Sequence, residues 1–167
     1  MVLLGFTMFR EKILDGSKTQ TIRKLRKVPV KVGDKLYLYW KLRTKQCEKL
    51  GEAICTETFF LSISYHLYDS GSGIAWTIYR HKTPNSSGRK MPKEEAIDMA
   101  LRDGFNKDHN ANPYGLFFQP VQDMIRALER MHGDLHNQIF QVIRWKLCVG
   151  SKRKSKPTRL PNDSMKT

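Results

Sequence analysis

The sequence predicts an α+β domain in which many short strands roll into a small barrel and two helices lie outside it. Two observations support this prediction. Short runs of alternating or β-branched residues, separated by turn residues, recur through the first 80 residues and again near residue 140. Two later stretches, 93–103 and 119–131, carry apolar residues at helical spacing. Frequent short strands with few helices are typical of small barrels and rolled sheets.

The first 80 residues predict five strands and one short helix. A helical turn over 10–15 ends at Gly16. Pro29 interrupts the chain after the second strand, and a Val-Gly-Asp turn at 32–34 leads into the third. The basic stretch 43–49 is expected to be a connection, and the fourth strand is expected to bend. The strands are expected over 1–9, 19–25, 35–40, 51–68 and 74–80.

The remaining residues predict two helices and a closing strand. A loop over 81–92 precedes the first helix, in which Pro92 takes the first position and Gly104 follows the end. A second loop spans 106–115, and Pro120 opens the second helix, which Gly133 ends. A strand over 137–149 completes a domain of residues 1–149. The basic, proline-containing tail 150–167 is expected to be disordered.

Composition favours a cytoplasmic protein without a membrane segment, metal or other cofactor. The longest apolar runs, such as 58–63, are too short to span a bilayer, and residues 1–9 lack the basic start of a signal peptide. The three cysteines, Cys47, Cys55 and Cys148, form no Cys-x-x-Cys pair, and their odd number fits a reducing compartment. The five histidines lack zinc-ligand spacing.

The net charge of +14 is concentrated in two places. Residues 10–49 hold 13 basic and 4 acidic residues, a net charge of +9. Residues 50–148 hold 11 of each and are neutral, and the tail 149–167 holds 6 basic residues and 1 acidic residue. A basic segment and a basic tail predict a polyanionic partner such as RNA. A basic surface kept for solubility is the alternative.

The most informative segment is 15–23, a turn leading into a strand. Lys18 lies at the turn, and Thr19, Thr21 and Arg23 share one face of the strand because side chains alternate. A lysine, a hydroxyl and an arginine together suit an anion or a polar nucleobase. The lysine would activate the threonine hydroxyl if burial or nearby Arg23 lowered the pKa of the lysine. An exposed strand edge is the alternative, since Lys-Thr-x-Thr alternation is common there.

Segment 16–23 (Gly-Ser-Lys-Thr-Gln-Thr-Ile-Arg), followed by 32–36 (Val-Gly-Asp-Lys-Leu), closely resembles the signature of ASCH domains. That signature reads Gly-x-Lys-Thr-x-Thr-x-Arg and then a Val-Gly-Asp-like turn into a strand. Segments 50–53 and 140–145 are also similar to the family. The resemblance covers most of residues 1–148 and is strongest over 16–54. It implies a PUA-like β-barrel with peripheral helices, a cleft lined by the motif, and a role in RNA binding or RNA metabolism.

The chain also resembles small bacterial members of the family, amidohydrolases that remove the acetyl group from N4-acetylcytidine. The resemblance implies a nucleophile at Thr21, a general base at Lys18 and an orienting carboxylate at Asp103, where the family has glutamate. Thr21 would attack the acetamide carbonyl, and Lys18 would pass the proton to the leaving amine. Glu52 is the rival carboxylate. Beside RNA binding and deacetylation, a third possible function is that of a ribonuclease, because other ASCH proteins are linked to RNA cleavage.

Further side chains are candidates for contact with RNA. Tyr37 and Tyr39 either stack on a base or belong to the barrel core. Basic and hydroxyl side chains in and after the motif suit phosphates and polar base edges. This set comprises Arg23, Thr19, Lys24, Arg43, Lys45 and Lys49.

Overall fold

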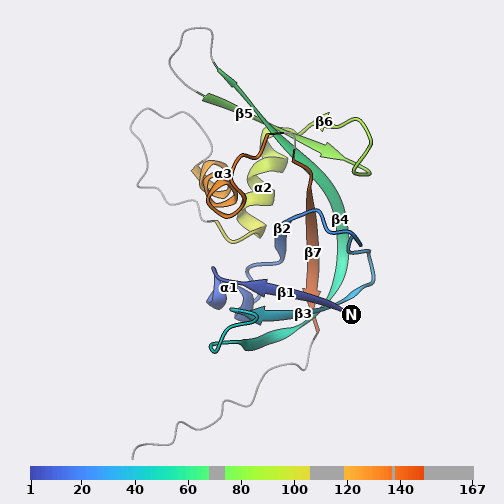
Figure 1. Ribbon diagram of the computed structural model, residues 1–167, viewed down its shortest axis with the longest axis vertical. Coiled ribbons are helices and arrows are strands. Elements are labelled where there is room, and N and C mark those ends of the chain that lie inside the picture. Colours follow the sequence, from blue (N-terminus) through green and yellow to red (C-terminus); the bar gives the residue numbers. More distant parts are fainter. Residues whose placement is uncertain (68–73, 106–118, 137, 149–167) are drawn as a thin grey trace, which may run out of the picture.

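The computed structural model describes residues 1–67, 74–105, 119–136 and 138–148, and its architecture is mixed α+β (Figure 1). Within these residues, seven strands form one sheet and three helices pack against it. The helices are α1 (Arg10–Leu14), α2 (Lys93–Arg102) and α3 (Gln119–His132). The strands are β1 (Val2–Phe6), β2 (Gln20–Lys24), β3 (Lys35–Trp40), β4 (Glu48–Leu67), β5 (Ile74–His81), β6 (Arg89–Lys90) and β7 (Phe140–Leu147).

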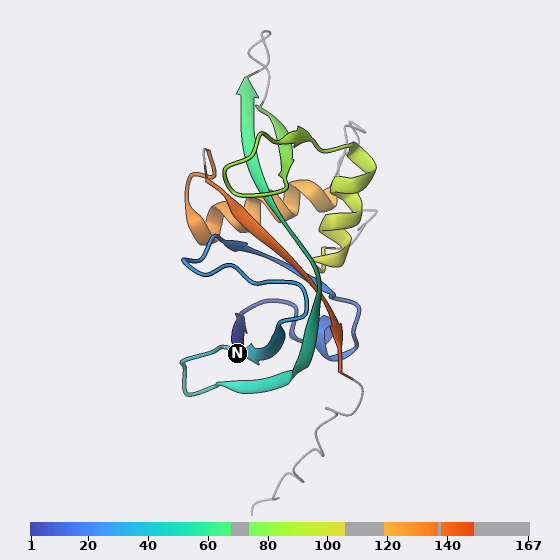
Figure 2. The same ribbon diagram turned by 90° about the vertical axis from the view of Figure 1, so that its right-hand side faces the viewer.

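The twenty-residue strand β4 connects the two ends of the sheet, as Figure 2 shows. Its first part pairs with β3 and its last part with β5, while β7 pairs along its middle. The sheet order is β1-β3-β4-β5-β6, and β7 also pairs with β2. Register shifts at Leu38/Tyr39 and Cys55/Glu57 interrupt the ladders beside β4. Such bulges bend a strand and increase its twist, so one strand serves both ends of the molecule.

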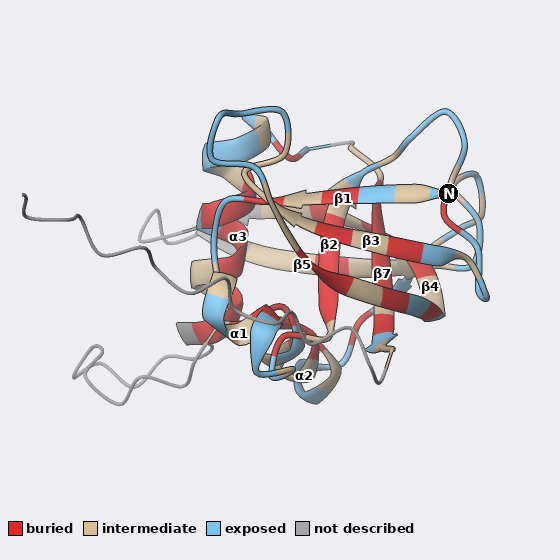
Figure 3. Ribbon diagram, turned by 90° about the horizontal axis from the view of Figure 1, so that it is seen from below, coloured by how far each residue is buried: buried red, intermediate tan, exposed pale blue. Residues whose placement is uncertain are grey.

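Two hydrophobic cores lie on opposite sides of β2 and β7. The first core lies where α2 and α3 pack on the sheet, and its helical side chains include Met99 and Leu128. The second core lies between β7 and the β1–β3 layer and contains Leu4 and Leu38. Neighbouring residues of β7 therefore enter different cores, and the buried positions along β2, β3 and β7 are visible in Figure 3.

Hydrogen bonds do not close the sheet into a barrel. Among the described residues, β1 pairs only with β3, and β2 pairs only with β7. Arginine side chains bridge the seam between β1 and β2. Arg23 Nη2 donates to the carbonyl of Gly5, and Arg26 Nη2 donates to the carbonyl of Leu3 at 3.0 Å. The unpaired carbonyls of an edge strand need partners, and here these side chains supply them.

The predicted helices over 93–103 and 119–131 agree with α2 and α3, but several local predictions are wrong. Pro92 is the N-cap of α2 rather than its first residue. Lys49 lies in β4 and not in a connection, and the predicted loop over 81–92 contains the short strand β6. In β3, the leucines at 36 and 38 are buried, whereas Tyr37 and Tyr39 are only partly buried. The predicted loop 106–115 and tail 150–167 lie outside the described residues.

Candidate functional site

The backbone around Lys18 is tied to two helices. Gly16 adopts a left-handed conformation (φ 84°) that turns the chain from α1 towards β2. The Lys18 amide donates to the Lys12 carbonyl at 2.7 Å, and the Thr19 amide donates to the Arg102 carbonyl at 3.1 Å. These bonds hold the lysine against the C-terminal end of α2.

A buried ion pair between Lys18 and Asp103 forms the centre of the site. Lys18 Nζ donates to the carboxylate of Asp103 and also to its main-chain carbonyl. The side chains are only 4% and 10% exposed. Burial lowers the pKa of Lys18, and the charge of Asp103 opposes this shift. Burial likewise raises the pKa of Asp103 against the attraction of Lys18. The surroundings therefore make the charged form of each partner less favourable.

Asp103 is the C-cap of α2, where a carboxylate opposes the helix dipole. Two ammonium groups compensate at this end of the helix. Lys18 Nζ binds the carbonyl of Asp103, and Lys12 Nζ binds the carbonyl of Gly104. Cations that bind terminal carbonyls stabilise a helix end.

The Phe9 ring lies over the ammonium of Lys18. Its Nζ lies 5.2 Å from the centroid of the Phe9 ring, which contacts Phe105 edge-to-face at 5.0 Å. Gly104 has φ 100°, and a Cβ placed there would lie 3.1 Å from Phe9 Cγ. Only glycine both adopts this conformation without strain and lets the ring approach so closely. The apolar cover excludes water from the pair and strengthens its electrostatic interactions.

Thr21 and Arg23 point away from α2 and towards the β1–β3 layer. Residues directly opposite in an antiparallel pair project from the same face, and Thr21 lies opposite Ile143, which belongs to the second core. Gln20 points the other way and donates to the Met99 carbonyl of α2 at 3.0 Å. Thr21 and Arg23 therefore share one face as expected, whereas Thr19, which was expected on the same face, precedes β2.

Not every hydrogen-bond donor of the Arg23 guanidinium has a partner among the described residues. One Nη binds the Gly5 carbonyl, and the guanidinium carbon lies 4.9 Å from the centroid of the Phe6 ring. Its Nε is buried and has no partner among the described residues. Burial lowers the pKa of Arg23, and the charge of Asp103 acts in the opposite direction. Lys18, Arg23 and Asp103 are thus close enough to influence one another, with two cations for one carboxylate.

Thr21 is a buried residue, and its hydroxyl forms no hydrogen bond within the described part of the chain. It has no hydrogen bond to Lys18, whose donors reach Asp103 instead. An ammonium carries three donors, so one remains for a ligand or for this hydroxyl.

Glu52, the rival carboxylate, has partners in the β3–β4 ladder. It pairs with Lys35 at 2.8 Å and with Lys49. These hydrogen bonds lower the pKa of Glu52 to about 2. Of the two carboxylates considered from the sequence, the structure places Asp103 beside Lys18 and Glu52 beside these other lysines.

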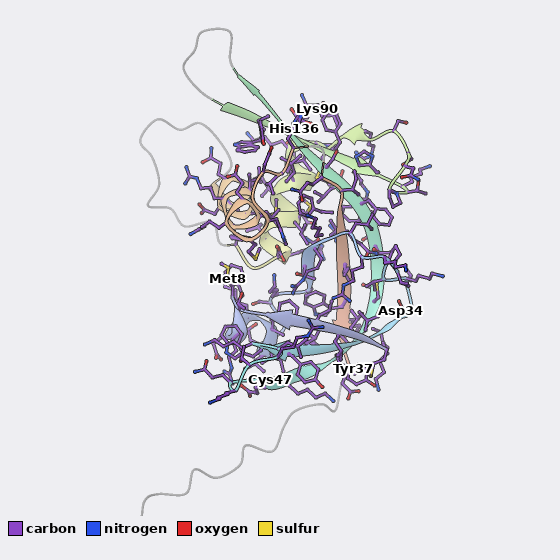
Figure 4. All side chains as sticks on the ribbon, in the orientation of Figure 1. Met8, Asp34, Tyr37, Cys47, Lys90 and His136 are labelled. Carbon is purple, nitrogen blue, oxygen red and sulfur yellow. The ribbon has the colours of Figure 1, made fainter. Side chains whose placement is uncertain are left out.

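The side chains of the remaining candidate residues form no hydrogen bond or ion pair with the Lys18 ammonium, whose partners among the described residues are atoms of Asp103. Thr19 is partly buried, and its carbonyl accepts a hydrogen bond from the Trp145 amide at 2.9 Å. Lys24 is exposed at the end of β2. Arg43 and Lys45 are exposed between β3 and β4. Cys47, in the same connection, lies at the β1–β3 end of the molecule, far from the end labelled by Lys90 and His136 (Figure 4).

Sequence reasoning missed two residues that shape the site. Phe9 adopts a left-handed backbone conformation (φ 61°), which is rare for a bulky side chain, and its ring covers Lys18. Lys12 reaches the end of α2, 92 residues away along the chain. No local pattern signals either role, because both depend on where α2 ends.

Within the described ranges, no group of three or more His, Cys, Asp or Glu side chains is arranged to hold a metal ion. No helix in those ranges has the length and apolar character needed to cross a membrane. Comparisons with known proteins give no match for this chain among family models, curated proteins or solved structures.

Proposed function

We propose that this chain is an ASCH-type domain of the PUA-like superfamily that binds RNA or a modified nucleoside through Lys18, Thr21 and Arg23. The motif over 16–23 and the turn over 32–34 supply the family resemblance. A rolled sheet whose seam is bridged by arginines is compatible with an open version of the PUA-like barrel.

The observation that carries the binding proposal is the unsatisfied guanidinium of Arg23. A buried donor without a partner costs free energy, and a ligand that accepted a hydrogen bond from Arg23 Nε would recover it. Two cations face one carboxylate at this site, so a phosphate or a base carbonyl would balance the charge. The basic segment 10–49 supplies longer-range attraction for a polyanion.

Binding is tested with a fluorescently labelled single-stranded oligoribonucleotide and two matched variants, Arg23→Met and Arg26→Met. Both remove one arginine that bridges the seam, but Arg26 is exposed and Arg23 is not. Arg23→Met should weaken binding by about tenfold or more, the value of a charge-assisted hydrogen bond. Arg26→Met should change it by less than about threefold.

Circular dichroism and urea unfolding of both variants show whether each is folded under the binding conditions. If both variants are folded and lose the same amount of RNA affinity, the binding depends on overall positive charge and the proposed site is wrong. Isothermal titration with free N4-acetylcytidine tests whether a modified nucleoside alone is sufficient.

The second candidate function is deacetylation of N4-acetylcytidine, which the hydrogen bond between Lys18 and Asp103 specifically favours. A lowered pKa makes Lys18 a better base at neutral pH. The Thr21 oxygen would bond to the acetyl carbon as the C–N bond breaks, and Lys18 would carry the threonine proton to the cytidine amine. Water would then hydrolyse the threonine ester and release acetate. For this step Lys18 would have to be a neutral amine, with its lone pair turned towards the Thr21 hydroxyl when the substrate binds.

Acetate release from N4-acetylcytidine tests this second function. Thr21→Ser keeps a hydroxyl and should retain activity, whereas Thr21→Val keeps the side-chain shape and should abolish it while sparing affinity. If the wild-type protein binds N4-acetylcytidine and releases no acetate, the chain is a binding module and the catalytic reading is wrong.

A further inference from the structure

An open pocket of about 680 Å³ lies between the end of β1 and the connection from β3 to β4. This volume lies within the range of small-molecule sites. The pocket does not include Lys18, Thr21, Arg23 or Asp103, although it adjoins the site described above. It is lined by Gly5, Phe6, Thr7, Lys41, Leu42, Thr44, Lys45 and Gln46.

The chemistry of the lining combines apolar walls with positive charge. Leu42 and the small exposed part of Phe6, a core residue that is 5% exposed, supply apolar surface, and the lining includes two lysines and no acidic residue. Lys45 is exposed and forms no hydrogen bond or ion pair with any described residue. Lys41 Nζ binds the side-chain oxygen of Gln46, which leaves two of its three donors for a ligand.

The connection that forms one side of the pocket is held in a defined shape. Lys41 and Arg43 have positive φ values of 41° and 70°, a conformation that costs non-glycine residues free energy. The Lys41 amide binds the Phe6 carbonyl at 2.8 Å, and the Thr44 hydroxyl binds the Lys41 carbonyl at 2.8 Å. These bonds fix the backbone of the connection to the end of β1, so the backbone positions of the two lysines are set before a ligand arrives.

Gly5 determines how closely the two sides of the pocket approach. A Cβ added at this glycine would lie 2.8 Å from Leu42 Cβ, so an alanine there must displace the leucine. The same glycine accepts a hydrogen bond from Arg23, and Phe6 lies beneath the Arg23 guanidinium. The pocket and the Arg23 site therefore share two adjacent residues of β1.

We propose that this pocket binds a nucleoside phosphate, with the phosphate held by Lys41 and Lys45 and the base against Phe6 and Leu42. The inference rests on the proposed function in one respect. If the protein binds single-stranded RNA, the pocket takes a nucleotide that flanks the one at Arg23. A free nucleotide presents the same chemistry, and the experiment separates these two sources.

The test measures binding of cytidine 5′-monophosphate and of a labelled hexauridylate to the full chain and four variants, one of which is the Arg23→Met variant described above. Lys45→Met removes one proposed phosphate contact, and Gly5→Ala displaces the pocket wall. Lys27→Met is the matched control, because Lys27 is exposed in the same basic segment and does not line the pocket. Amide NMR shifts on adding cytidine 5′-monophosphate locate the site, and urea unfolding shows that each variant is folded.

We expect cytidine 5′-monophosphate to shift the amides of Thr7, Leu42 and Thr44. Lys45→Met should weaken its affinity about tenfold, the value of a hydrogen bond to a charged group, and Lys27→Met should change it less than twofold. Gly5→Ala should weaken it as well. Equal affinity for inorganic phosphate would overturn the role of the apolar wall, and no binding to the wild-type protein would overturn the pocket proposal.

The hexauridylate distinguishes failure of this proposal from failure of the proposed function. Loss of hexauridylate affinity in both Lys45→Met and Arg23→Met would support one RNA path across the two sites. RNA binding that depends on Arg23 and not on Lys45 would leave the proposed function standing and remove the pocket from it. Nucleotide binding that depends on Lys45, without RNA binding, would support a site for free nucleotides and contradict the RNA reading.

Discussion

The buried pair of Lys18 and Asp103 should be needed as a pair and yet contribute little net stability. Lys18→Met keeps most of the side-chain length and removes the ammonium, leaving a carboxylate that is only 10% exposed without its counter-ion. Breaking a buried pair in this way costs about 3–5 kcal/mol. With a urea m-value of ~2 kcal/mol/M, the unfolding midpoint should fall by about 2 M. Asp103→Leu should cost a similar amount.

The double variant Lys18→Met/Asp103→Leu should be far more stable than the sum of its single changes predicts. Replacing a buried pair with apolar residues is often neutral or stabilising by about 1–4 kcal/mol, because both desolvation penalties disappear. Burial shifts the pKa of each partner in the direction that disfavours its charge, which is consistent with this expectation. The double-mutant cycle isolates the coupling between the two side chains.

The two single variants should respond to pH in opposite directions. Asp103 has a folded pKa raised above its unfolded value of 3.8, so Lys18→Met should recover stability as the pH falls through that raised pKa. Lys18 has a folded pKa lowered below its unfolded value of 10.5, so Asp103→Leu should recover stability as the pH rises towards 10.5. Urea unfolding at several pH values between these limits measures both trends.

The control is Arg102→Met, which breaks an exposed pair with Asp98 whose side chains are 47% and 48% exposed. This change should cost less than about 0.5 kcal/mol. If Lys18→Met costs no more than this control, and its pH profile parallels that of the wild-type protein, the pair is not buried and the reasoning fails.

Three further predictions concern charge, backbone and thiol chemistry. RNA affinity should fall steeply with salt, because a plot of log affinity against log salt concentration has a slope of about −0.7 per phosphate neutralised on a single strand. Deleting 150–167 should make this slope shallower. An affinity that did not change with salt would contradict the charge argument. Gly104→Ala should destabilise the protein by about 1–3 kcal/mol in urea unfolding, because Gly104 has a positive φ and the new Cβ would crowd Phe9. Gly33 also has a positive φ but has no neighbour within 4 Å, so Gly33→Ala should show only the cost of the backbone conformation. Burial raises the pKa of Cys55 to about 11, so alkylation at pH 8 followed by peptide mass spectrometry should find exposed Cys47 modified well before Cys55; equal rates would show that the Cys55 thiol is accessible.

The local sequence was sufficient to predict elements whose signals lie within a few residues. Helix α2 follows from its acidic first turn and its terminal glycine, and α3 follows from its apolar spacing. The same alternation placed Thr21 and Arg23 on one face of β2, because side chains alternate in any strand. These predictions needed no knowledge of which elements are neighbours in space.

Tertiary structure decided the features that join distant parts of the chain. Lys18 meets Asp103 across 85 residues because α2 ends beside the turn before β2. Among the described residues β1 and β2 do not pair, and Arg23 and Arg26 bridge them instead, an arrangement that no single strand's composition reports. Periodicity reports which face of an element is apolar, but it carries no information about the partner of that face. The ion pair, the seam and the pocket beside Gly5 exist only because packing brings separate segments together.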